Sequence, residues 1–303
     1  GAANSKKNCT YWSDMKCLKA TLSYFFDKGA QMVLLAVVPA LLSALVFSPS
    51  AGLYFLMCYG DLHADSFASL YTQMHFLSYD FFWAGIIGLV LYFFVIALLF
   101  GIVDRHMRIG EFTVSFRRAK TRINYNILTA LKFGVTAGVI FEVGDLLLTL
   151  LYYAWASVFG SGEAWLVFGI LSWAAVSAML LYTMAAILLW PPFMLHTGLR
   201  SRDAFKMGWR QMSGRLPSSV LTLLVCIVPF VVVMSVIGAV TSSTVARVVV
   251  DGVAMAVCIP YYITLMYVQF YDVTGTERMD LQKTDIWSKK VARRDRKRLR
   301  GKN

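Results

Sequence analysis

The sequence predicts an all-α, polytopic membrane protein with six transmembrane helices, and two observations carry this prediction. Hydrophobic residues make up 58% and charged residues only 15% of the 303 positions, and the mean hydropathy is +0.62, which lies far outside the soluble globular range. All 29 Lys and Arg residues except Arg247 also lie in four segments separated by three apolar blocks. The chain has room for about six spans of roughly 20 residues each, but none for a separate soluble catalytic domain.

The distribution of positive charge predicts the topology, because cytoplasmic loops keep Lys and Arg and short translocated loops do not. The basic segments hold five such residues in 1–28, seven in 105–132, five in 200–215 and eleven in 278–303. Each apolar block must leave the cytoplasm and return, which gives six spans with both termini cytoplasmic. We expect one transmembrane domain over residues 1–277 and a basic cytoplasmic tail over 278–303, in a bacterial cell inner membrane.

The first apolar block begins with an amphipathic pattern and continues into a span. Apolar residues recur at helical spacing in Tyr11, Met15, Leu18, Leu22 and Phe25. This pattern fits either a helix lying on the membrane surface or a cytoplasmic extension of the first span. The span itself is expected near residues 31–47, where Pro39 should kink it.

Residues 48–80 form the longest predicted exterior segment and contain no Lys or Arg. Imidazole and carboxylate groups are common metal ligands, and the candidates here are Asp61, His63, Asp65 and His75. Their spacing matches no metal motif, so a solvated loop is the favoured interpretation and no metal is predicted. Residues 67–77 are expected to form a short interfacial helix. The second span follows at 81–103, with Gly85 and Gly88 permitting close helix contact.

The second block begins with a predicted surface helix at 112–127, in which apolar residues at helical spacing alternate with four basic residues. The third span, 131–153, is apolar but contains Glu142 and Asp145. A glycine-containing turn then leads to the fourth span at 165–189. We expect Pro191 and Pro192 to end this span at the cytoplasmic border.

The third block repeats the same order. A surface helix is predicted from the spacing of Phe205, Trp209, Met212 and Leu216, followed by spans at 217–239 and 246–271 that contain Pro229 and Pro260. Three units of surface helix plus hairpin, beginning near residues 15, 112 and 204, indicate a threefold internal repeat of about 90 residues. Internal repeats of this kind are common among transport folds.

Glu142 and Asp145 are the candidate substrate or proton site. A charge at the centre of a span costs at least ~2.5–3.5 kcal/mol on insertion scales, so intramembrane carboxylates need a partner, water or the protein interior. Their i, i+3 spacing places them on one helix face. Arg247 and Asp251, on the outer turn of the sixth span, are the nearest expected charges. The alternative interpretation is a structural ion cluster that joins Arg247 to Asp145 or Asp251.

The basic segments are expected to contact anionic lipid headgroups on the cytoplasmic side. The residues assigned to this contact are Arg117, Arg118, Arg122, Lys206, Arg210, Arg293 and Arg294. The tail from Lys289 to Lys302 carries nine basic residues and one acid, but no aromatic platform accompanies it, so no nucleic acid is expected. A membrane or cytoplasmic protein is a further possible partner.

The sequence contains no pattern that predicts an enzyme. Phosphate-binding glycine loops, zinc spacings, redox CxxC pairs and GxSxG elbows are all missing from it, so no catalytic residue, metal or cofactor is assigned. Of the five cysteines, Cys226 and Cys258 fall within spans and Cys58 is the exterior one, so no exterior disulfide is expected.

Two stretches carry a resemblance to a known group. The surface helices SFRRAKTRINYNILTALKFG and DAFKMGWRQMSGRLPSSVLTLL, and a closing pattern of Tyr271, Asp272, Glu277, Asp280 and Leu281, resemble bacterial six-helix inner-membrane proteins related to the membrane domain of glycerophosphodiester phosphodiesterases. The chain departs from the group at residues 274–276, where more basic character is expected, and it lacks the catalytic barrel. The resemblance implies a helical fold in a bacterial cytoplasmic membrane and transfers no catalytic residue.

Two functional classes remain open on the sequence. The first is a transporter, permease-like or lipid-handling component with an acidic intramembrane site. The second is a non-catalytic membrane scaffold or subunit that docks a partner through its basic cytoplasmic helices and tail. A hydrated environment around Glu142 favours the first class, whereas a dry, fully paired interface favours the second.

Overall fold

The computed structural model of the chain describes residues 2–58, 66–78, 81–112, 116–160, 163–241 and 243–281, with the side chains of 2–15, 58 and 116–118 outside the description. The helices in these residues are α1 (Ala2–Ser43), α2 (Ala51–Cys58), α3 (Phe67–Met74), α4 (Phe82–Ile109), α5 (Phe116–Phe159), α6 (Glu163–Ala186), α7 (Trp190–Thr197), α8 (Ser201–Met212), α9 (Leu216–Val240) and α10 (Thr244–Thr274). The one β-bridge in the described part pairs Phe47 with Leu77.

Six helical segments are long and apolar enough to cross a membrane. They are Lys16–Ser43, Phe82–Ile109, Ala119–Phe159, Glu163–Thr197, Leu216–Val240 and Thr244–Thr274. The outer faces of these segments expose large apolar side chains in helical stripes, which suits contact with acyl chains and not with water. The chain is therefore an all-α, multi-pass membrane protein, and the predicted fold class is confirmed.

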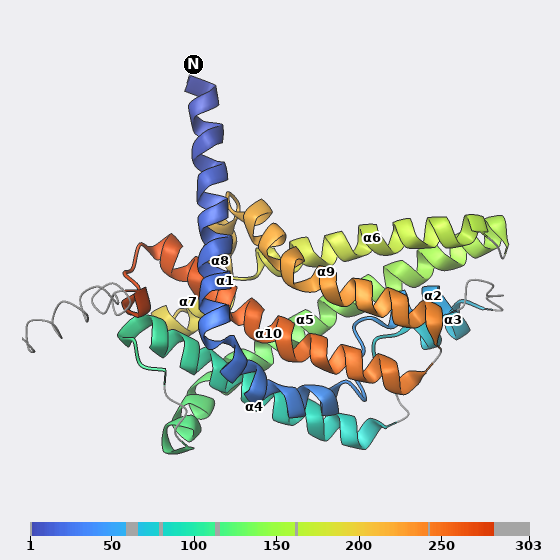
Figure 1. Ribbon diagram of the computed structural model, residues 1–303, viewed down its shortest axis with the longest axis horizontal. Helices are drawn as coiled ribbons and strands as arrows, with labels where there is room; N and C mark the ends of the chain where they lie inside the picture. The colour runs from blue at the N-terminus through green and yellow to red at the C-terminus, as the bar shows by residue number, and fades with distance from the viewer. Residues whose placement is uncertain are drawn as a thin grey trace, which may run out of the picture.

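The hairpins share one orientation. In Figure 1 the α5–α6 and α9–α10 turns, together with α2 and α3 between the first two spans, lie at the right-hand end of the bundle. The links from α4 to α5, from α7 to α8 and beyond α10 lie at the left-hand end, where the basic segments gather. This arrangement of ends is the one predicted from the positive charges.

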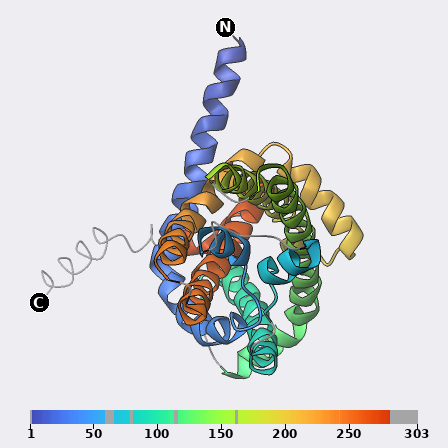
Figure 2. The same ribbon diagram turned by 90° about the vertical axis from the view of Figure 1, so that its right-hand side faces the viewer.

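Helix α10 is the central helix of the bundle. It packs against α1, α4, α7 and α9, and the view along the bundle in Figure 2 shows it enclosed by its neighbours. Every residue from Pro260 to Tyr271 is buried, so this half of α10 is apolar or hydrogen-bonded on all sides, as a fully enclosed helix requires.

Small residues set the spacing of α1 and α4. A Cβ added to Gly88 would lie 2.5 Å from the carbonyl carbon of Leu42, and one added to Gly85 would lie 2.5 Å from the Cβ of Val46. The two glycines therefore allow the close helix contact that the sequence predicts.

The surface helix and the span of the first two units are continuous, which differs from the sequence prediction. The predicted helix at 112–127 and the span at 131–153 form the single helix α5, and Phe112 precedes it. The N-terminal part of α1 likewise runs without a break into the first span but projects sideways, across the bundle axis (Figures 1 and 2). That sideways course favours the surface-lying interpretation over an extension along the span.

Two further differences concern short helices. The fourth span breaks after Ala186, before the two prolines, and Pro191 and Pro192 occupy the first turn of α7 instead of ending a helix. Proline fits there because the first helical N–H groups have no intrahelical acceptor. Helix α2 was not predicted, and α3 confirms the expected short helix but is packed into the bundle, with Leu70 and Met74 both 2% exposed.

The second helix of each hairpin ends in the same way at the basic end of the bundle. Helices α4, α7 and α10 each stop at a glycine with left-handed backbone, Gly110, Gly198 and Gly275, whose φ angles are 70°, 68° and 64°. Glycine adopts this conformation without a steric cost. The shared ending agrees with the internal repeat inferred from the sequence.

Candidate functional site

The segment between the first two spans folds back onto the bundle. Ser48 donates its N–H to the Phe76 carbonyl at 2.6 Å, and Ser78 donates its N–H to the Val46 carbonyl at 2.9 Å. These bonds tie the departing and returning strands together on either side of the Phe47–Leu77 bridge. We call residues 46–58 and 66–78, which include α2 and α3, the capping segment.

Glu142 is bound by the capping segment. The Tyr71 hydroxyl donates to Oε1 of Glu142, and Nε2 of His75 lies 2.8 Å from Oε2. Tyr71 and His75 are four residues apart at the end of α3, so the helical repeat brings both onto one face. The His75 side chain is 8% exposed, whereas the Glu142 side chain remains 38% exposed. The carboxylate is therefore held by two donors while part of it stays open.

Asp145 is bound by the next residue of the same segment. Its Oδ2 accepts the backbone N–H of Phe76 at 2.8 Å. Consecutive residues of the capping segment thus meet two carboxylates one turn apart on α5, which confirms that Glu142 and Asp145 share a helix face. The opposite, exposed stripe of α5 is apolar and consists of Val139, Val143, Leu146 and Leu150. The two carboxylates therefore point toward the capping segment and away from that apolar stripe.

Asp251 binds the other strand of the capping segment. Its carboxylate accepts the hydroxyl of Ser48, and the residue is 2% exposed. The Arg247 guanidinium lies over the Tyr54 ring, 5.7 Å from its centroid, and its Nε is buried without a hydrogen-bond partner. Within the described residues, Arg247 forms no ion pair with Asp145 or Asp251. The expected structural ion cluster is therefore not formed.

The three intramembrane carboxylates share a single role in the geometry. Each accepts a hydrogen bond from the capping segment, and none of them bonds to another. Their donors are a phenol, an imidazole, a hydroxyl and a backbone N–H, and no lysine or arginine among the described side chains forms an ion pair with Glu142. The sequence argument found the acceptors but not these donors, because neutral groups in an apolar loop leave no charge signal.

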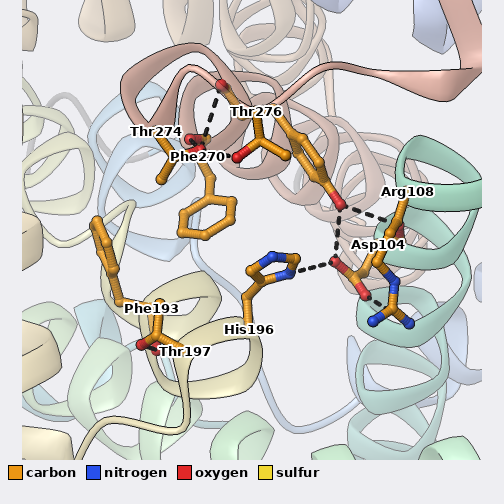
Figure 3. A network of polar contacts seen from close by, with 9 residues as sticks. Asp104, Arg108, Phe193, His196, Thr197, Phe270, Thr274 and Thr276 are labelled. Carbon is orange, nitrogen blue, oxygen red and sulfur yellow. Dashed lines mark hydrogen bonds and ion pairs between the residues drawn. The ribbon is translucent and has the colours of Figure 1, made fainter.

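A second polar cluster lies at the other end of the bundle (Figure 3). Asp104 of α4 accepts from the Tyr271 hydroxyl at 3.3 Å, lies 3.3 Å from Nδ1 of His196, and pairs with Arg108 at 3.7 Å. Asp104, His196 and Tyr271 belong to the closing helices of the three different hairpins. The sequence analysis did not single them out; aligning the three units on their terminal glycines is the signal that finds them.

The residues assigned to lipid headgroups are partly described. Lys206 and Arg210 lie exposed on α8, and Arg122 is half-buried on α5. The apolar partners Phe205 and Trp209 are 38% and 49% exposed and stack on one another. The opposite face of α8 is buried through Ala204, Gly208 and Met212. Arg293, Arg294 and the side chains of Arg117 and Arg118 lie outside the described residues.

The metal candidates are separated by the fold description. Asp61, His63 and Asp65 lie outside the described residues, and His75 contacts Glu142. No group of three His, Cys, Asp or Glu side chains in the described part is arranged to hold a metal ion.

The chain was compared with known families and proteins after the geometry was established. No protein family, curated protein or solved structure matches it. The class that the fold defines is therefore a multi-pass membrane protein with an acidic site between a span and a capping segment, and its function follows from the site alone.

Proposed function

We propose that this protein is a transport protein of the bacterial cytoplasmic membrane in which Glu142 binds a proton or another small cation beneath the capping segment. The single observation that carries the proposal is the state of Glu142, which is held by Tyr71 and His75 yet keeps 38% of its side chain exposed. A permanent structural anchor is better served by full burial and a fixed cationic partner.

The donors around Glu142 suit a site that opens and closes. A carboxylate inside a span must be neutralised, hydrated or hydrogen-bonded. Tyr71 and His75 supply that compensation in the closed arrangement without a fixed positive charge. A proton or cation that takes their place compensates the same carboxylate and releases α3. Binding of the cargo and opening of the capping segment are then two sides of one exchange.

The proposal includes both termini on the cytoplasmic side and assigns no catalytic step to the protein. The resemblance to the membrane domain of glycerophosphodiester phosphodiesterases agrees with this location and stays a prediction. A lipid-derived cationic headgroup is within the cargo class that an acidic site accepts, so a lipid-handling role belongs to the same proposal.

A scaffold role is the second candidate, and α8 is the observation that favours it. Phe205 and Trp209 are exposed beside Lys206 and Arg210, which gives one helix an aromatic and basic surface. Such a surface binds a headgroup layer or an acidic partner without any transport. In that case Glu142 serves only to fix the capping segment.

The two candidates predict different outcomes for Glu142→Gln, which keeps the size of the side chain and removes its ionisation. In proteoliposomes with an internal pH dye and a clamped membrane potential, we expect the wild type to carry protons after an acid pulse and the variant to lose that flux while remaining folded. Glu163→Gln is the matched control, because Glu163 is exposed in the first turn of α6 at the same end of the bundle.

The scaffold interpretation gives the reverse pattern. Glu142→Gln would then lower the stability of the detergent-purified protein, and neither the wild type nor either variant would carry protons above the rate of empty vesicles. That outcome would refute the transport proposal for protons. A cation screen on the wild type, read as protection of the Glu142–capping segment contact from thermal unfolding, then tests the remaining cargo class.

A further inference from the structure

Two cysteines meet in the middle of the last hairpin, away from the acidic site. Sγ of Cys226 on α9 lies 3.5 Å from Sγ of Cys258 on α10. Both thiols are free and half-buried. A disulfide has an S–S distance of about 2.05 Å, so the sulfur atoms would have to approach by only about 1.5 Å.

The register of the hairpin holds this contact in place. One turn away from it, the Tyr261 hydroxyl donates to the Thr222 carbonyl across the same two helices at 3.0 Å. Both cysteines also lie just before a proline within their helix, Pro229 in α9 and Pro260 in α10. A proline removes one backbone hydrogen bond and permits local bending. The helices are therefore aligned at the thiols and able to adjust there.

The location limits which oxidant reaches the pair. Cys226 and Cys258 lie well inside the membrane-spanning segments Leu216–Val240 and Thr244–Thr274. A water-soluble disulfide or a redox protein does not enter the hydrocarbon layer, whereas a lipid-soluble quinone does. The half-buried state of both residues leaves one side of the pair open to the acyl region.

We propose that Cys226 and Cys258 form a reversible redox pair that is oxidised to an α9–α10 disulfide by a membrane quinone. The two S–H bonds break and one S–S bond forms. The two electrons and two protons pass to the quinone, which becomes the hydroquinone. Reduction by a membrane-permeant dithiol reverses the step by thiol–disulfide exchange. The proposal is independent of the transport function proposed for Glu142.

The test uses the full chain in membranes, with Cys9, Cys17 and Cys58 replaced by serine so that only the pair remains. The membranes are treated with decylubiquinone, whose ring has no free position for addition to a thiol. The protein is then denatured and its free thiols are tagged with a polyethylene glycol maleimide. We expect two tags per chain before oxidation, none after it, and two again after treatment with a permeant dithiol.

A matched control keeps Cys17 and Cys226 and replaces Cys258 by serine. Cys17 is a suitable partner because it is also half-buried, on α1, where Gln269 donates to its sulfur. We expect this control to keep both tags under the same oxidation. Persistence of both tags in the Cys226–Cys258 protein would overturn the proposal, and so would equal loss of tags in the control, since that indicates general thiol oxidation.

Discussion

Glu142 is the residue whose surroundings define how the acidic site works. Its two donors come from a single face of α3, and the distance along the chain between donor and acceptor is 67 to 71 residues. The strength of the contact therefore depends on two neutral side chains from a segment that is otherwise apolar. Removing one donor isolates its contribution while the other still holds the carboxylate.

Tyr71→Phe is the first test at this scale. The change removes the hydroxyl that donates to Glu142 and keeps the ring, which also stacks on Phe67. Because the carboxylate is partly exposed, water replaces the lost donor in part, and we expect a loss of about 1–2 kcal/mol in the free energy of unfolding. Denaturant unfolding in detergent measures it.

The control for that substitution is Tyr182→Phe, since Tyr182 is exposed on α6 and no other residue depends on its hydroxyl in the described structure. Its unfolding free energy should match that of the wild type. If the two variants were equally stable, the Tyr71 hydroxyl would contribute nothing to closing the site.

The acidic site also shows what residue-level sequence reasoning reaches. A carboxylate in an apolar run is conspicuous, so Glu142 and Asp145 were found directly, and their i, i+3 spacing predicted their common face. Their partners were expected among charges, which led to Arg247. The actual partners are a phenol, an imidazole and a backbone N–H, whose positions follow from the folding of a long loop and not from any charge pattern.

At the scale of the elements, glycine positions decide how closely the spans pack. The contact of α4 with α1 depends on Gly88, where an added Cβ would meet the backbone of Leu42 at 2.5 Å. Backbone atoms cannot move aside as a flexible side chain does. A methyl group at this position therefore has to separate the two helices.

Gly88→Ala is accordingly expected to destabilise the protein by about 1–3 kcal/mol through overpacking. Gly138→Ala provides the matched control, because Gly138 lies inside α5 with nothing within 4 Å of its added Cβ. That change should be neutral or stabilising by about 0.5–1 kcal/mol, since alanine favours the helix. Thermal unfolding of both variants in the same detergent gives the comparison, and a Gly88→Ala protein as stable as Gly138→Ala would contradict the close contact.

The surface of α8 leads to a prediction about membrane insertion. Phe205 and Trp209 stack on each other and stay exposed while the opposite face is buried. Replacing both with Asp places two charges in the headgroup boundary and should reduce the amount of folded, membrane-inserted protein severalfold, because the helix loses its apolar contact. Detergent-extracted protein that remains monodisperse on gel filtration is the quantity to measure.

A change on the polar side of the same helix serves as the reference. Gln211→Asp adds a negative charge at an exposed position of α8 and should leave the yield of folded protein close to that of the wild type. Equal losses in both proteins would indicate a general effect of negative charge on α8 and not a role of the aromatic pair.

Element boundaries were the part of the fold that the sequence predicted least well. The predicted surface helix and third span merged into α5, since the residues between them contain neither proline nor a glycine turn. Conversely, Pro191 and Pro192 suggested an end where the structure begins α7. The prolines mark a break in both readings, but only packing of the short helix into the core decides on which side of them the helix lies.

At the scale of the whole molecule, the positive charges carried the prediction. Segregation of the basic residues gave the number of spans and the common end of the three links, and the structure shows both. These features depend on the bilayer and on charge, which act on the chain regardless of how individual side chains pack. The folding of the capping segment has no such simple cause, so it could not be read in advance.

The compartments at the two ends are tested by thiol labelling in intact cells. In a chain without native cysteines, Ser66→Cys at the start of α3 should react with a membrane-impermeant maleimide, whereas Ser201→Cys at the start of α8 should not. Permeabilised cells should label both positions, which shows that each thiol is accessible. Labelling of Ser201→Cys alone in intact cells would reverse the predicted topology.

The small bridge between Phe47 and Leu77 has a consequence for variation among sequences of this architecture. It closes the chain on itself where the capping segment leaves and rejoins the bundle. Lengthening a closed loop costs little, about 0.6 kcal/mol for each doubling of its length. Insertions and deletions between these two residues are therefore expected to be tolerated in evolution, while the positions facing Glu142, Asp145 and Asp251 keep their register.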